Sequence, residues 1–297
     1  MNKMLSLALA LPLMACVVGS DAPTGTGTGG DSTGGTGGGT GSGGGDGTGG
    51  GGGSNSGGGT PMTGDITANT TWSGNVSVPK SIAVATGATL TIAAGTTVKF
   101  ASGVAITING KMDVQGVKGN VVTFAPATAG GFYSGFTVST GGTLAMSYVA
   151  QTGGDILVNG GTATIVDSRM SNASGDLLVV NSGKVDMSYS AIGLEPNKGT
   201  DSTHCDMHFG GSGATISVTH SNISTSSYGL MLYGGNNVNL TYNNWFNNPI
   251  QIDTNAGVSG DISNGWFDKA VPTAGAGATL TFNNKAAVRL TDAGPRD

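Results

Sequence analysis

The stretch Leu144-Ala-Met-Ser-Tyr148 returns four times along the chain, as Ala163-Thr-Ile-Val-Asp167, Val185-Asp-Met-Ser-Tyr189, Ile216-Ser-Val-Thr-His220 and Val238-Asn-Leu-Thr-Tyr242. The first and third residues of each copy are apolar, which is the alternation of a strand with one buried face. The copies start 19, 22, 31 and 22 residues apart. A strand that returns about every 22 residues indicates a solenoid, in which each repeat stacks on its neighbours.

Two further features belong to the same repeat. The residue seven positions after each start is apolar in all units but the first, in the column Gln151, Met170, Ile192, Ile223 and Trp245. A second strand then follows, as Ile156–Val158, Leu178–Val180, Met207–Phe209, Leu230–Leu232 and Ile250–Ile252. Glycine pairs such as Gly160-Gly161 supply the positive φ that tight corners need. We therefore predict an all-β fold, a parallel β-helix of roughly eight or nine coils about 4.8 Å apart.

Two columns of large side chains lead to opposite expectations. The fifth residues of the copies are mostly aromatic, and we expect them to stack outside the coils as a partial ladder that Asp167 interrupts. Trp245 instead shares the apolar column, so we expect it in the core rather than on a sugar-binding platform. The ladder column is Tyr148, Asp167, Tyr189, His220 and Tyr242.

The first half of the body resembles a known family. The segments that carry the resemblance are Thr71-Trp-Ser-Gly74, Gly87 to Phe100, Gly110 to Gly116 and Val122-Thr-Phe124. They look like the opening of right-handed parallel β-helices of the pectin-lyase-like superfamily. The resemblance implies right-handed coiling and says little about activity. We expect the β-helix domain to span residues 63–297, with a C-terminal cap from about residue 257, where the repeat fades.

The N-terminal residues indicate where in the cell the protein is sent. A positive Lys3 and a short apolar run precede Leu13-Met-Ala-Cys16, which resembles the lipobox of bacterial lipoproteins. We predict a signal peptide over residues 1–15 and a lipid on Cys16. Residues 16–62 would form a flexible Gly/Thr/Ser linker, since 22 of the 37 residues from Thr24 to Thr60 are glycine. Val17 follows the cysteine where a retention aspartate would stand in the best-known sorting rule, so we expect an outer-membrane or cell-surface location.

Composition narrows the function classes. The chain has 297 residues, a formal net charge of −5 and only 10% charged residues, which argues against a nucleic-acid binder. Pectinolytic members of the resembled superfamily use acidic residues on neighbouring coils with Arg, Lys or Ca²⁺, but the repeat region holds only Arg169 and Glu195 of the residue types Arg and Glu. We expect a non-catalytic module that binds or displays at the envelope, with a glycan, matrix or neighbouring cell as partner. A polysaccharide lyase or glycoside hydrolase and a purely structural envelope protein remain alternatives.

Three aspartates are the candidates for chemistry. Asp155, Asp176 and Asp206 each precede the second strand of a unit, so on consecutive coils they could stack about one strand spacing apart. When carboxylates lie so close together, the pKa of one of them rises or the group binds a cation. This set is therefore the catalytic candidate and the one candidate Ca²⁺ site. No other cofactor is expected. Three solvated turn aspartates are the alternative.

The 31-residue spacing marks an insertion of roughly Gly193 to Cys205, and solenoid insertions often form a binding face. His204 and His208 have the spacing of metal ligands on a helix, but His208 falls on a predicted strand and would point outward, so a stacked His220 and an exposed His208 are the preferred interpretation over zinc. The binding candidates are Glu195, Lys198, Asp201, His204, Tyr228 and Tyr233.

The lipid anchor is testable in bacterial cells that express the chain. We expect the wild type to take up an alkyne analogue of palmitate and to sediment with membranes, because each buried methylene contributes about 0.8 kcal/mol. Cys16→Ser should lose the label and appear in the soluble fraction. Cys205→Ser, at the second cysteine of the chain, is the matched control and should keep the label. A label retained by Cys16→Ser contradicts the prediction.

Overall fold

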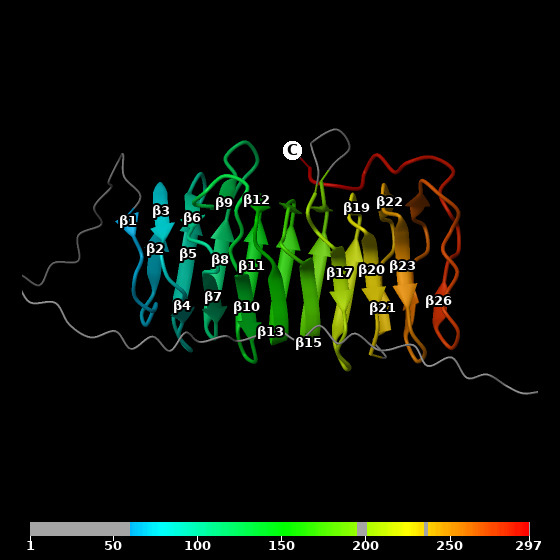
Figure 1. The fold of residues 1–297 in the computed structure, drawn as a ribbon, viewed down its shortest axis with the longest axis horizontal. Helices are drawn as coiled ribbons and strands as arrows, with labels where there is room; N and C mark the ends of the chain where they lie inside the picture. The colour runs from blue at the N-terminus through cyan, green and yellow to red at the C-terminus, as the bar shows by residue number, and fades with distance from the viewer. Residues whose placement is uncertain (1–59, 195–200, 235–236, 297) are drawn as a thin grey trace, which may run out of the picture. The chain divides into compact units, whose positions relative to one another are not determined.

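The computed structural model describes residues 60–194, 201–234 and 237–296. All regular elements in these ranges are strands, and they form a parallel β-solenoid of about nine coils, which confirms the predicted fold class. In Figure 1 the strands follow one another in chain order along the stack. None of the described residues belongs to a helix long and apolar enough to cross a membrane. The predicted signal peptide, Cys16, most of the linker, Glu195 and Lys198 lie outside the described residues.

Each coil passes through three faces, which we call faces 1, 2 and 3. Face 1 is a ten-stranded parallel sheet. Its strands, in stacking order, are β1 (Thr60–Pro61), β3 (Asn75–Val78), β6 (Thr97–Phe100), β9 (Val122–Pro126), β12 (Val149–Thr152), β14 (Arg169–Ser171), β16 (Ala191–Ile192), β19 (Asn222–Ser224), β22 (Asn244–Phe246) and β25 (Trp266–Phe267).

Faces 2 and 3 belong to one sheet because β13 (Ile156–Val166) and β15 (Asp176–Ser188) run through the corner between them. The other strands of face 2 are β4 (Ile82–Val84), β7 (Ala105–Ile108), β10 (Gly135–Ser139), β17 (Cys205–Phe209), β20 (Tyr228–Leu232) and β23 (Ile250–Thr254). Those of face 3 are β2 (Thr70–Trp72), β5 (Thr89–Ala93), β8 (Lys111–Gln115), β11 (Thr143–Ser147), β18 (Thr215–Thr219), β21 (Asn237–Asn239), β24 (Ser259–Asp261) and β26 (Thr279–Thr281).

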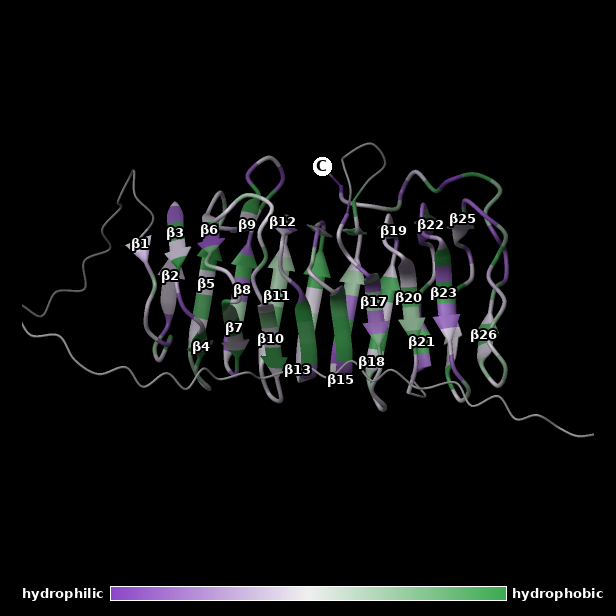
Figure 2. Cartoon of the chain, in the orientation of Figure 1, coloured by the Kyte–Doolittle hydropathy of each residue, from purple (hydrophilic) through white to green (hydrophobic). Residues whose placement is uncertain are grey.

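The strand register confirms the predicted repeat. The starts of the five copies lie opposite one another across neighbouring coils, as in Leu144 opposite Ala163 and Ile216 opposite Val238. The second apolar column is also formed, and Trp245 at its end is fully buried. Figure 2 shows hydrophobic and hydrophilic segments alternating along many of the strands.

One predicted alignment is wrong. Leu230 lies opposite Ile252, not Ile250, which instead faces Tyr228 and is 41% exposed. A shift of two residues leaves the same side chains on the same face of a strand. The alternation Ile250-Gln-Ile252 therefore fits either register, and Ile252 takes the core position.

The corner between faces 3 and 1 depends on an uncommon backbone conformation. The five ladder residues have φ between +46° and +61°, a region that non-glycine residues seldom adopt. After four of them the next residue, Ser168, Ser190, Ser221 or Asn243, is buried and accepts a hydrogen bond from a backbone N–H of the preceding coil. Ser190 Oγ accepts from Ser168, and Asn243 Oδ1 accepts from Ser221. These side chains satisfy backbone groups where the chain leaves the regular ladder.

The predicted aromatic ladder is present outside this corner. The ring centroids of Tyr189 and His220 are 4.9 Å apart, as are those of His220 and Tyr242. Arg296 fills the interruption, because its guanidinium lies 3.9 Å from the Tyr189 ring centre and bonds Asp167 at 2.7 and 2.8 Å. Burial raises the pKa of Asp167, but the bonds from Arg296 outweigh it and hold that pKa below its usual value.

Arg296 belongs to a C-terminal strap, residues 286–296, that runs back across the coils (Figure 1). In the strap, the N–H of Ala286 donates a hydrogen bond to the carbonyl of Gly265, and the N–H of Gly294 donates one to the carbonyl of His220. Leu290 exchanges two hydrogen bonds with Asn244. Stacking itself continues past residue 257, where the sequence repeat fades, through β24, β25 and β26. Val271, Leu280 and Phe282 pack against the core in this last part.

The strap should stabilise the solenoid through the Asp167–Arg296 pair. Arg296→Ala leaves a carboxylate that is 2% exposed without its partner, so we expect a loss of about 1–3 kcal/mol and a melting temperature several degrees lower. Because the folded pKa of Asp167 is depressed, this contribution exists above about pH 4 and is lost as the pH falls through the folded pKa. Thermal melts at several pH values measure both effects.

Arg289→Ala is the control on the same strap, since Arg289 lies over Phe246 at 4.2 Å. A cation–π contact of this kind is worth about 0.5–1 kcal/mol. An equal loss in both variants, or none in Arg296→Ala, would disprove the role of the ion pair.

Candidate functional site

The corner between faces 1 and 2 carries the long connections of the solenoid. In stacking order these are residues 127–134 after β9, 153–155 after β12, 172–175 after β14 and 193–204 after β16. Two short turns therefore lie between two long connections. Two hollows lie along this corner, lined by connection 127–134, by the two short turns and by residues of neighbouring coils.

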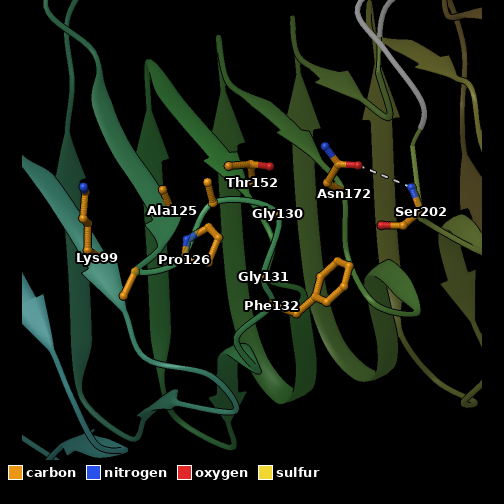
Figure 3. Close-up of a pocket in the computed structure, with 11 residues that line it drawn as sticks. Lys99, Ala125, Pro126, Gly130, Gly131, Phe132, Thr152, Asn172 and Ser202 are labelled. Carbon is orange, nitrogen blue, oxygen red and sulfur yellow. Dashed lines mark hydrogen bonds between the residues drawn. The ribbon is translucent and has the colours of Figure 1, made fainter.

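The larger hollow, which we call the long groove, has a volume of about 680 Å³. Figure 3 shows Lys99 at one end and Ser202 at the other, with Asn172 accepting a 3.3 Å hydrogen bond from the Ser202 N–H. Lys99 is the only charged residue among the described residues that line it. The lining residues are Lys99, Ala125, Pro126, Ala127, Ala129, Gly130, Gly131, Phe132, Thr152, Asn172 and Ser202.

Connection 127–134 presents the aromatic ring of Phe132 to the groove because the next residue, Tyr133, is anchored in the core. Tyr133 is buried, stacks on Phe100 with centroids 4.3 Å apart, and donates its N–H to Gly153. Its ring lies so close to Gly154 that a Cβ there would be 2.3 Å away. Phe132, one residue earlier, remains half-exposed and lines both hollows.

The smaller hollow, which we call the Asp155 pocket, has a volume of about 330 Å³. Oδ1 of Asp155 is buried and has no hydrogen-bond partner among the described residues. Burial raises the pKa of Asp155 to about 7, its own backbone N–H opposes this, and the charge of Asp176 adds to it. The lining residues are Ser102, Gly103, Phe132, Tyr133, Ser134, Asp155, Ala173, Ser174 and Gly175.

The three candidate aspartates do not form one column on consecutive coils. The register places Asp155 and Asp206 in a row with Leu177 between them, and Asp176 lies opposite Cys205. Asp206 is fully buried, which raises the pKa of its carboxyl well above the usual value. No group of three or more His, Cys, Asp or Glu side chains in the described ranges is placed to share a metal ion. The role of Asp155, Asp176 and Asp206 as catalytic residues or calcium ligands stays a prediction.

Asp176 instead joins the two histidines. Its carboxylate oxygens lie 3.0 Å from His204 Nδ1 and 2.7 Å from His208 Nδ1. Burial raises the pKa of Asp176, but these two bonds outweigh it and place that pKa below its ordinary value. His208 points outward, as predicted, and shares the Asp176 carboxylate with His204. The sequence signal for this cluster is the one-residue offset of Asp176 from the column of Asp155 and Asp206.

The tyrosine candidates lie against the same cluster. Tyr228 packs on His204 with centroids 5.2 Å apart, and Tyr233 meets His208 edge-on at 5.7 Å. The Tyr233 hydroxyl donates to Asp253. The Asp201 carboxylate is not part of this cluster. It accepts hydrogen bonds from the backbone N–H groups of Asn172, Leu194 and Thr203. Asp201 therefore holds the base of connection 193–204.

Comparison of the chain with protein-family models, with curated proteins and with solved structures gives no match. The pectin-lyase-like resemblance of its first half therefore rests on the quoted segments alone.

The buried acids should make the protein less stable as the pH rises. The folded pKa of Asp155 is about 7, above the ordinary value of 3.8, so its destabilising effect is absent below about pH 4, grows between about pH 4 and 7, and is then constant. Asp155→Asn should raise the melting temperature by a few degrees at about pH 8 and leave it unchanged near pH 4. Asp206→Asn should act in the same direction.

Asp186→Asn, at an exposed position of β15, changes the net charge equally and should show no such pH-dependent difference. If the melting temperatures of Asp155→Asn and wild type differ by the same amount at both pH values, the raised pKa of Asp155 is wrong.

Proposed function

We propose that this is a lipid-anchored protein of the bacterial outer membrane or cell surface whose solenoid binds a glycan in the long groove without cleaving it. The observation that carries the proposal is the lining of the groove. It combines a half-exposed aromatic ring, Phe132, with neutral polar side chains, and its described residues include no carboxyl or imidazole group.

A sugar chain has the chemistry that such a lining recognises. A pyranose ring offers an apolar C–H face, which packs on an aromatic ring, and hydroxyl groups, which exchange hydrogen bonds with Thr152, Asn172 and Ser202. The lining residues come from five successive coils, so the groove extends for about 19 Å along the stack, the length of several sugar units.

The same lining argues against catalysis in the groove. Glycoside hydrolysis by the common route needs two carboxyl groups, and general acid–base catalysis needs a titratable group within hydrogen-bond reach. One observation keeps a lyase or hydrolase as the second candidate: Asp155 lies in the neighbouring pocket with a pKa of about 7, which suits proton transfer at neutral pH. A purely structural envelope role predicts no glycan binding at all.

The proposed anchor and linker fit a binding role. A lipid on Cys16 followed by a Gly/Thr/Ser chain would let the solenoid reach a matrix or a neighbouring cell.

Glycan arrays and calorimetry test the proposal. We expect the protein to bind a glycan without releasing reducing ends or unsaturated uronates. Phe132→Ala should weaken binding about 5–10-fold, because it removes a stacking contact of about 1 kcal/mol. Trp266→Ala is the matched control, since it removes a half-exposed aromatic ring far from the groove in the chain, and should leave the affinity unchanged. Glycan cleavage, or equal affinities of wild type and Phe132→Ala, would refute binding in this groove.

A further inference from the structure

We infer that the Asp155 pocket is a subsite for a primary ammonium group, so that the groove prefers a glycan with free amino sugars over its N-acetylated form. This inference rests on the proposed glycan-binding function and names the substrate class of the same site.

The two hollows are neighbours. Phe132 lines both, and Asn172 of the long groove is followed in the chain by Ala173, Ser174 and Gly175 of the pocket. A sugar unit that packs on Phe132 from the groove therefore has substituents within reach of the pocket. The pocket has about half the volume of the groove, which suits a substituent rather than a whole oligosaccharide.

The pocket offers one carboxyl group, which becomes negatively charged when it loses its proton, and several acceptors. Asp155 is the only charged residue among its described lining residues. Ser102, Ser134 and Ser174 add hydroxyl oxygens, and Ser134 donates its own proton to Gly103, which leaves its lone pairs free. An ammonium group has three N–H donors and no acceptor, so one carboxylate and nearby hydroxyls match it.

No cationic side chain of the described residues is paired with the carboxyl of Asp155. Its Oδ1 has no partner in the described structure, and a Cβ on Gly135 would come within 2.5 Å of it, so glycine is required beside it. The described charged side chain that acts on it is Asp176, whose own charge is engaged by His204 and His208. Tyr133, the other titratable group that faces it, is buried and neutral. A bound cation would supply the missing charge and hydrogen bonds.

Other ligands fit the pocket less well. An acetamido group lacks the positive charge, and a carboxylate would be repelled. A divalent metal prefers several oxygen ligands with more than one carboxylate. The described residues offer it no such set.

Calorimetry on the full chain tests the inference, with Cys16→Ser present in every sample to remove the lipid. The probes are a glucosamine hexamer, an N-acetylglucosamine hexamer and hexalysine, at about pH 6 and near-physiological salt. We expect the glucosamine hexamer to bind at least tenfold more tightly than the N-acetylated one. Asp155→Asn should abolish this preference while its affinity for the N-acetylated hexamer stays the same. Asp186→Asn should keep the preference.

Proton release provides an independent measurement. At pH values below its pKa of about 7, the carboxyl of Asp155 is mostly protonated in the free protein. Binding an ammonium group at about pH 6 should therefore release a proton. The apparent binding enthalpy of the wild type should then depend on the ionisation enthalpy of the buffer, and that of Asp155→Asn should not.

The outcomes separate the two proposals. Equal affinities for both hexamers, or a preference that persists in Asp155→Asn, overturn the subsite and leave the glycan groove standing. Binding of neither hexamer overturns both proposals. Hexalysine that binds as tightly as the glucosamine hexamer shows that the site takes ammonium groups from peptides, which overturns the amino-sugar assignment.

Discussion

The hydrogen bonds between consecutive coils are the constraint on which the rest of the structure depends. Each coil must match the next strand by strand on three faces, so changes in length are absorbed at corners and not within strands. The corner between faces 1 and 2 absorbs most of them, in connections 127–134 and 193–204. The long groove and the Asp155 pocket lie at this corner, where connection 127–134 meets the turns of neighbouring coils.

How far the sequence predicts each part follows from this constraint. The register of the repeats was predicted to the residue because apolar alternation must continue across every coil, and it failed only at Ile250, where two registers preserve the same alternation. The groove was not predicted. Lys99, Thr152 and Ser202 are separated by about 50 residues each and share no spacing, and only stacking brings them together. The cluster of Asp176 with His204 and His208 was missed because Asp176 lies on the coil before the two histidines, 28 and 32 residues away in the chain.

Neighbouring aspartates behave differently because of the direction in which they point. Asp206 points into the core, so burial raises its pKa. Asp176 belongs to the next position of the same face, reaches two imidazoles and has a lowered pKa. Since strand side chains alternate between the two sides, a shift of one residue moves a carboxyl between these environments. The one-residue offset of Asp176 thus decides whether it titrates like Asp155 or forms a stable ion.

The C-terminal strap alters how a solenoid of this kind loses its structure. In a simple solenoid each coil contacts only its neighbours, so the end coils fray one at a time. Here Arg296 reaches back to Asp167, 129 residues earlier in the chain, and the strap touches the coils between them. Fraying from the C-terminal end must first release contacts on several coils together. The coils from Asp167 to β26 are thereby coupled into one cooperative unit, and the strap can dock only after those coils have formed.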